Sequence, residues 1–160
     1  MSGDGPGEGN KMSEHRVNVQ WVRGKDDFNF ESYNRDHMWT FEGGIEIKAS
    51  AAPGFQGNPD CVDPEEAFVG ALSSCHMLTF LAIAAKKRLT VDSYEDDAVG
   101  ILEKNADGRM AVTRVTLRPR VAWGGDKTPT PEDIEKMHEK AHHACFIANS
   151  VLTEVSIESR

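Results

Sequence analysis

The feature that most constrains the fold is a run of nineteen residues with no charged side chain, 67–85 (AFVGALSSCHMLTFLAIAA). Its length raises the question of a membrane span, because about 18 or more apolar residues can cross a bilayer. Glycine, serine, histidine and threonine interrupt the run, no second such run exists, and the chain as a whole is hydrophilic. A soluble helix without a charged face needs protein on every side. We therefore expect a buried central helix and no membrane partner.

The residues before this run carry a strong helix-start signal, Asp63-Pro64-Glu65-Glu66. Asp63 is suited to the N-cap, Pro64 to the first helical position, and Glu66 to the third position of a capping box. Lys86, Lys87 and Arg88 then complement the C-terminal end of the helix dipole. The sequence predicts one helix from Asp63 to about Arg88.

Alternating apolar and polar residues predict strands on both sides of this helix. Before it they occur at 16–21, 28–32, 39–41 and 45–48, and a turn at 24–27 predicts a hairpin between the first two; 49–62 is expected to be a loop. After it we expect a hairpin of two long strands, 94–103 and 109–123, in which Pro119 indicates an edge or a bulge. A second helix over 130–148 and a closing strand over 151–157 follow. This order predicts an α+β fold.

Length and charge limit the classes of protein to consider. A chain of 160 residues suits one domain, which we place at 14–160 after a Gly-rich tail, 1–13, that is expected to be disordered. A net charge of -8 disfavours nucleic acid as a partner. The N-terminus has neither the basic start nor the apolar run of a signal peptide, so we expect a cytoplasmic protein.

Three cysteines could carry chemistry: Cys61, Cys75 and Cys145. A cysteine in an apolar helix is more often an inert packing residue than a reactive one. Cys75 also lies too far from the helix N-terminus for the helix dipole to stabilise its thiolate, so a nearby cation such as arginine would have to do so. Cys145, expected in the second helix, could meet Cys75, and the spacing permits a redox pair without proving one.

Two segments resemble a known family. DPEEAFVGALSSCH is similar to the segment around the peroxidatic cysteine of the OsmC/Ohr family of hydroperoxide reductases, and AHHACFIANSV is similar to the segment around that family's second cysteine. The resemblance extends over about 17–157. It implies an OsmC-like fold, with an antiparallel sheet packed around the long helix in an intertwined homodimer.

The resemblance also implies a mechanism. Cys75 would reduce an organic hydroperoxide and become a sulfenic acid, and Cys145 would resolve this acid to a disulfide. A dithiol, commonly a dihydrolipoyl group in the family, would then reduce the disulfide, and no cofactor is implied. By motif position Arg35 matches the arginine that activates the thiolate, and Glu65 matches the glutamate that positions this arginine. Arg35 has an alternative role as a surface loop arginine paired with Asp36.

Glu65 poses a geometric problem, because ten residues of helix separate it from Cys75 by ~15 Å. If both serve one site, either the helix breaks between them or Glu65 comes from a second subunit. Glu65 also has a simpler role as a first-turn charge at the helix dipole.

The chain departs from the Ohr-type members of the family at two positions. Ohr-type members have an aromatic residue after the first cysteine and a proline after the second, whereas this chain has His76 and Phe146, which places it nearer the broader OsmC-like branch. We interpret His76 as a packed core histidine and Cys61 as a bystander thiol.

His138-Glu139-x-x-His142 fits a zinc-hydrolase motif, so a metal-dependent hydrolase is one alternative function. The simpler interpretation of His138, His142 and His143 is a solvated helix face. A non-catalytic, ligand-binding dimer is the other alternative function.

Overall fold

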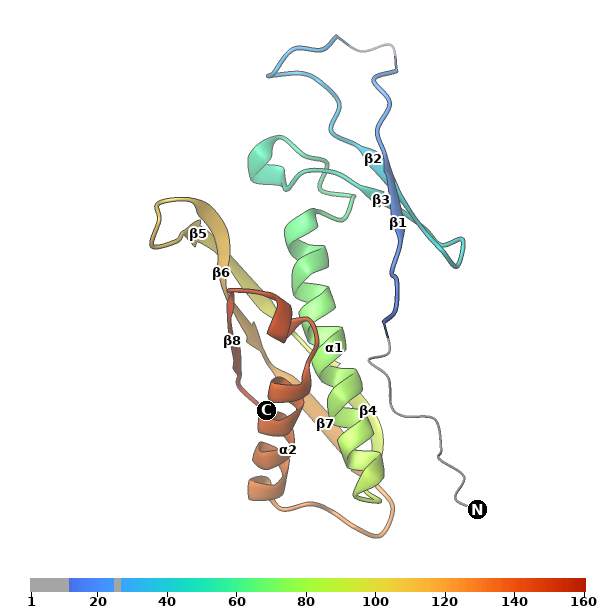
Figure 1. Ribbon diagram of the computed structural model, residues 1–160, viewed down its shortest axis with the longest axis vertical. Coiled ribbons are helices and arrows are strands. Elements are labelled where there is room, and N and C mark those ends of the chain that lie inside the picture. The colour runs from blue at the N-terminus through green and yellow to red at the C-terminus, as the bar shows by residue number, and fades with distance from the viewer. Residues whose placement is uncertain (1–11, 25–26) are drawn as a thin grey trace, which may run out of the picture. The chain divides into compact units, whose positions relative to one another are not determined.

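The structure is a computed structural model that describes residues 12–24 and 27–160 (Figure 1). The chain divides into two compact units, Met1–Val62 and Asp63–Arg160, and each is described by itself. Most of the tail expected at 1–13 lies outside the described residues. The single domain over 14–160 stays a prediction.

The first unit contains one antiparallel sheet of three strands, β1 (Val17–Gln20), β2 (His37–Phe41) and β3 (Glu46–Ala49), in that order. A short 3-10 helix, η1 (Pro53–Phe55), follows. The strand expected at 28–32 is wrong, because β1 pairs with β2 and no strand forms there. Phe28, one of the residues that suggested it, instead packs between two other rings, with its ring centroid 5.7 Å from that of Trp21 and 5.3 Å from that of Tyr33.

The second unit begins with the long helix α1 (Pro64–Lys86), which starts where the sequence predicts. Asp63 accepts a hydrogen bond from the Glu66 backbone N–H at 2.8 Å, and the Glu66 carboxylate accepts one from the Asp63 N–H at 3.4 Å. These two bonds form the expected capping box and satisfy N–H groups that have no partner within the helix. The 23-residue helix is unbroken.

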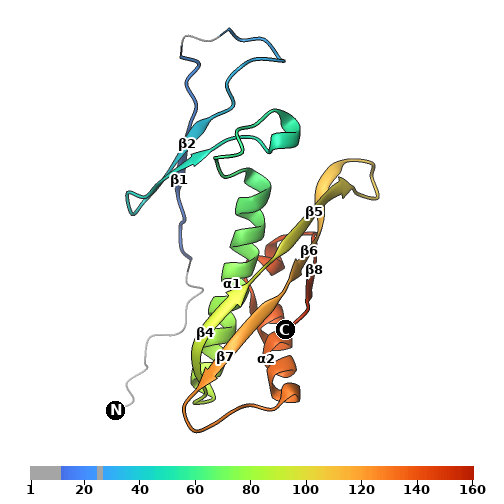
Figure 2. The same cartoon turned by 180° about the vertical axis from the view of Figure 1, so that it is seen from behind.

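The predicted long hairpin is present but divides into two sheets (Figure 2). Its first half is β4 (Thr90–Asp96) and β5 (Val99–Lys104), and its returning half is β6 (Met110–Leu117) and β7 (Pro119–Gly124). β4 pairs with β7, and β5 pairs with β6. Pro119 has no N–H to donate to a ladder, and it stands where the returning strand changes sheets.

Two further elements complete this unit, and each corrects an expectation. The strand β8 (Glu154–Ile157) pairs with β6 in parallel, so the sheets are not wholly antiparallel. The helix α2 (Pro131–Ala144) ends earlier than predicted, and Cys145 is its C-cap residue, with extended backbone. A 3-10 turn, η2 (Ala148–Ser150), leads from there towards β8. Cys145 therefore lies at the end of the second helix and not within it.

Two apolar clusters hold α1 against the rest of the second unit. Phe80 and Ala84 pack with Met137 and Ala141 of α2, and Leu72 packs with Val115 and Leu117 of β6. α1 and α2 run side by side in both views (Figures 1 and 2).

Another stripe of α1 faces outwards and carries no charge. Its exposed residues are Gly70, Ala71, Ser74, Leu78, Ala82 and Ala85, and Leu78 is 62% exposed. By length and composition α1 could cross a membrane, a test that the core helix of a soluble protein also passes. Only 22% of its most apolar window is buried within the chain. The rest of the second unit therefore leaves this stripe of the helix uncovered.

Candidate functional site

Cys75 and Cys145 meet within the second unit, although seventy residues separate them in the sequence. Cys75 lies in the middle of α1 and is half-buried, whereas Cys145 caps α2 and is 1% exposed. Both thiols are free, and Cys75 lies close enough to Cys145 to raise the pKa of the Cys145 thiol. The packing of α1 on α2 thus produces the pairing that the sequence permitted but did not prove.

The surroundings of Cys145 favour its protonated form. Burial raises the pKa of the Cys145 thiol, the backbone N–H of Ala148 at 3.5 Å acts in the opposite direction, and the neighbouring Cys75 side chain raises the pKa again. Burial and the neighbouring Cys75 thus oppose formation of the Cys145 thiolate.

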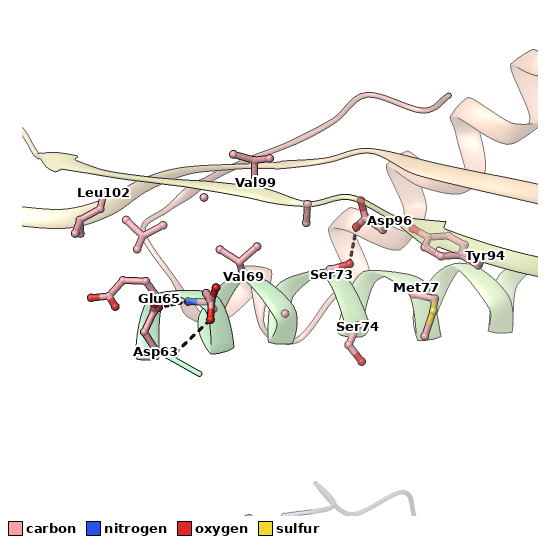
Figure 3. Close-up of a pocket in the computed structure, with 15 residues that line it drawn as sticks. Asp63, Glu65, Val69, Ser73, Ser74, Met77, Tyr94, Asp96, Val99 and Leu102 are labelled. Atoms are coloured by element: carbon pink, nitrogen blue, oxygen red, sulfur yellow. Dashed lines mark hydrogen bonds between the residues drawn. The ribbon is translucent and has the colours of Figure 1, made fainter. Parts of the chain in front are cut away.

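Glu65 lies in the first turn of α1 and lines a cavity of the second unit that has a volume of about 710 Å³ (Figure 3). The unbroken helix excludes a break between Glu65 and Cys75, so ~15 Å of helix separates them in one chain. The lining residues do not include Cys75. Of the two explanations that the sequence left open, only a second subunit remains for a site shared by Glu65 and Cys75.

The other end of this cavity contains a polar group from β4. Figure 3 shows the Ser73 hydroxyl donating to the carboxylate of Asp96, which also accepts from the Arg118 backbone N–H at 2.6 Å. The buried Tyr94 hydroxyl has no hydrogen-bond partner among the described residues. Burial, and then the Asp96 carboxylate, raises the pKa of Tyr94. The cavity is thus acidic at both ends and apolar between them, where Val69, Val99 and Leu102 contribute to the wall.

Arg35 belongs to the first unit and precedes β2. Its guanidinium donates to the carbonyls of Tyr33 and Phe30 at 2.9 and 2.8 Å, and it lies 4.0 Å from the centroid of the Tyr33 ring. Asp36, the partner expected for a surface arginine, instead accepts a hydrogen bond from Asn58. Arg35 is therefore held by backbone and ring contacts that leave its charge unneutralised by Asp36.

Cys61, the third thiol, also lies in the first unit. Burial, followed by the nearby Asp36 carboxylate, raises the pKa of Cys61. These surroundings oppose thiolate formation, and Cys61 stays the predicted bystander.

The histidines of the zinc motif have a different partner. The Nδ1 atom of His138 lies 3.0 Å from Nε2 of His76, and the two side chains are 4% and 1% exposed. Within residues 12–24 and 27–160, no group of three potential ligands is placed to hold a metal ion. The zinc-hydrolase alternative is therefore supported by the sequence pattern alone.

Comparison with known proteins identifies the family. The family model described as OsmC-like protein matches residues 57–160. The chain belongs to this family. An OsmC-like protein of unknown function from Vibrio cholerae is 53% identical, with a TM-score of 0.91 over 93% of this chain and 100% of that one. The family prediction and the OsmC-like α+β fold are thus confirmed.

Two more distant relatives of this OsmC-like chain are proteins of Bacillus subtilis. The organic hydroperoxide resistance protein OhrB of Bacillus subtilis shares the fold, with 17% identity and a TM-score of 0.65 over 92% of this chain and 98% of that one. The uncharacterised protein YmaD of Bacillus subtilis is 23% identical over 129 residues, which are 78% of this chain and 84% of that one. Structural neighbours of the family therefore include hydroperoxide resistance proteins.

Sequence reasoning about this OsmC-like protein missed the partnership of His76 and His138. It interpreted His76 as a packed core histidine, which its burial bears out, and His138 as part of a solvated helix face, which is wrong. The spacing of Met137, Ala141 and Cys145 defines the buried stripe of α2, and His138 lies beside Met137 on its edge. This spacing could have indicated that His138 is buried.

Proposed function

We propose that the protein is a thiol peroxidase that reduces organic hydroperoxides. The observation that supports this most directly is the proximity of Cys75 and Cys145, two free thiols that α1 and the end of α2 bring together. Membership of the OsmC-like family and the fold shared with hydroperoxide resistance proteins agree with it. Cys75 is the peroxidatic cysteine in this proposal, because it is the more accessible of the two thiols.

The proposed reaction has three steps. The Cys75 thiolate attacks the distal oxygen of the hydroperoxide, the O–O bond breaks, and the alkoxide takes a proton to leave as an alcohol. The sulfur of Cys145 then attacks Cys75, the S–O bond of the sulfenic acid breaks, and hydroxide leaves with the proton of Cys145 as water. A dithiol finally reduces the disulfide by exchange and is itself oxidised.

The site needs a second copy of the chain. Glu65 lies too far from Cys75 along one unbroken helix to serve the same reaction, and the uncharged stripe of α1 lacks cover within its own unit. A homodimer would cover this stripe and bring Glu65 of one copy towards Cys75 of the other. In this proposal Glu65 positions Arg35, whose charge stabilises the Cys75 thiolate. The cytoplasm, where thiols are kept reduced, is the compartment that suits this chemistry.

Product mapping tests the proposal. Reduced wild-type protein is mixed with one equivalent of cumene hydroperoxide, and the peptides are analysed by mass spectrometry. We expect a Cys75–Cys145 disulfide and one equivalent of cumyl alcohol. If both cysteines stay reduced and the hydroperoxide persists, the peroxidase proposal is wrong, and bound ligand without chemistry would favour the non-catalytic dimer.

Arg35 provides a second prediction. Replacing Arg35 by alanine removes the cation that we assign to the thiolate, so peroxide consumption should slow by about 100-fold, as when one transition-state donor is lost. Stopped-flow kinetics measures the rate, and the pH profile of Cys75 alkylation should move to higher pH. Arg16→Ala, which removes an exposed arginine of the same unit, is the control. An Arg35→Ala rate equal to that of the control would assign the activating charge to another residue.

A further inference from the structure

The contact between α1 and α2 is apolar except at two points. Phe80 and Ala84 of α1 pack on Met137 and Ala141 of α2, with all four side chains buried. At one point Cys75 lies close to Cys145, and at the other the side chains of His76 and His138 are joined by a hydrogen bond. The mechanism proposed above uses the thiol pair but gives the histidine pair no role.

The histidine pair is enclosed on every side. The planes of its two rings are inclined by only 8°, so the N–H of one ring points at the nitrogen of the other across 3.0 Å. The Phe80 ring stacks on His138 with centroids 4.3 Å apart. Nδ1 of His76 and Nε2 of His138 are buried and have no hydrogen-bond partner among the described residues.

Stability alone does not explain this pair. Each buried polar atom without a partner costs free energy, and apolar side chains of similar volume would avoid that cost. A buried polar pair in an apolar contact does, however, favour one register, because sliding either helix would break its hydrogen bond. The hydrogen bond between the two histidines therefore favours one alignment of α1 with α2.

This alignment bears directly on the thiols. His76 follows Cys75 immediately, and His138 lies seven residues, or about two helical turns, before Cys145 on the same side of α2. A disulfide requires its sulfur atoms to come within ~2.05 Å of each other in a restricted geometry. A shift of one helix turn, ~5.4 Å, would separate the thiols completely.

We propose that His76 and His138 are positioning residues that hold α1 and α2 in the register at which Cys75 and Cys145 form their disulfide. The inference deepens the proposed function, since that disulfide is the second step of the proposed reaction. The histidines touch neither hydroperoxide nor the reacting sulfur atoms in this role. Formation of the sulfenic acid on Cys75 does not depend on them.

Exchange with glutathione tests this inference without any peroxide. Full-length protein is equilibrated with reduced and oxidised glutathione at pH 7, and the fraction of Cys75–Cys145 disulfide gives the effective concentration of the two thiols. His138→Leu should lower this effective concentration on the order of tenfold or more, because small misplacements of reacting groups have effects of this size. His138→Gln, whose amide can still bond to His76, should restore most of it. His143→Leu, at an exposed position of the same helix, is the matched control.

Folding is checked by circular dichroism, and the double variant His76→Leu/His138→Leu guards against loss of the fold, since it leaves no buried histidine without its partner. We expect the folded double variant to show the same reduced effective concentration. A wild-type value in either leucine variant would overturn the inference, and so would a loss in His143→Leu equal to that in His138→Leu. If wild-type protein forms the disulfide with glutathione but does not react with cumene hydroperoxide, the proposed function fails while the positioning role stands.

Discussion

Replacement of Cys75 by serine should abolish hydroperoxide reduction, with a loss of at least ~10³-fold in kcat/KM, because a serine hydroxyl cannot replace a thiolate as nucleophile in this reaction. The measurement is consumption of cumene hydroperoxide in the presence of dihydrolipoamide. Serine is close to cysteine in size, and the site is only half-buried, so the fold should persist. Circular dichroism and the melting temperature check this point.

Cys145→Ser should behave differently, and the difference assigns the two roles. This variant keeps the nucleophile, so it should consume one equivalent of hydroperoxide at the wild-type rate and accumulate a sulfenic acid that dimedone traps on Cys75. Cys61→Ser, in the first unit, should match the wild type. Trapping on Cys145 instead of Cys75, or full activity in Cys75→Ser, would reverse or refute the assignment.

Local signals in the sequence were sufficient for several elements. The cap of α1 depends on three neighbouring residues, Asp63, Pro64 and Glu66, and the bonds they form are those that the pattern predicts. The strand expected at 28–32 shows the limit of such signals. Its alternation of Phe28 and Phe30 satisfies the pattern of a strand, but β2 supplies the partner that β1 needs. Phe28 packs on the Tyr33 ring instead, and Phe30 is exposed.

Features that depend on the path of the chain were harder to predict. The parallel pairing of β8 with β6 and the change of sheets at Pro119 result from contacts between distant segments, which periodicity does not encode. The proximity of Cys75 and Cys145 was expected only as a possibility, because it requires α2 to return against the middle of α1. The His76–His138 bond arises from the same return, which explains why the sequence did not indicate that these two histidines are partners.

The buried histidine pair should make the fold sensitive to acid. Burial first, and then the neighbouring His138 and His142, lowers the pKa of His76 from 6.5 to about 4. Burial also lowers the pKa of His138 to about 4, against the opposing effect of the Asp96 carboxylate in β4. Both rings are therefore neutral in the folded protein near pH 7. In the unfolded chain they take up protons once the pH falls below about 6.5.

The sign of the effect follows from this difference in bound protons. Between pH 6.5 and pH 4 the unfolded state binds more protons than the folded state, so the free energy of unfolding decreases as the pH falls. Above pH 6.5 neither state binds a proton at these rings, and their contribution is constant. One histidine with this shift lowers the stability by on the order of 3 kcal/mol across that interval, at ~1.4 kcal/mol per pH unit. That is a large part of the ~5–15 kcal/mol typical of a folded domain.

Urea unfolding at pH 7.5, 6.5, 5.5 and 4.5, followed by circular dichroism, measures this loss. Carboxylates also titrate near the lower end of the range, so the decisive quantity is the difference between wild type and the double variant His76→Leu/His138→Leu. The double variant lacks both titrating rings, and its stability should change by at least ~1 kcal/mol less per pH unit between pH 6.5 and 5.5. Parallel pH profiles for the two proteins would mean that the pair accepts protons in the folded state as readily as in the unfolded chain. Since the same two rings align α1 with α2, acid should also weaken the contact between Cys75 and Cys145 in the wild type before the whole unit unfolds.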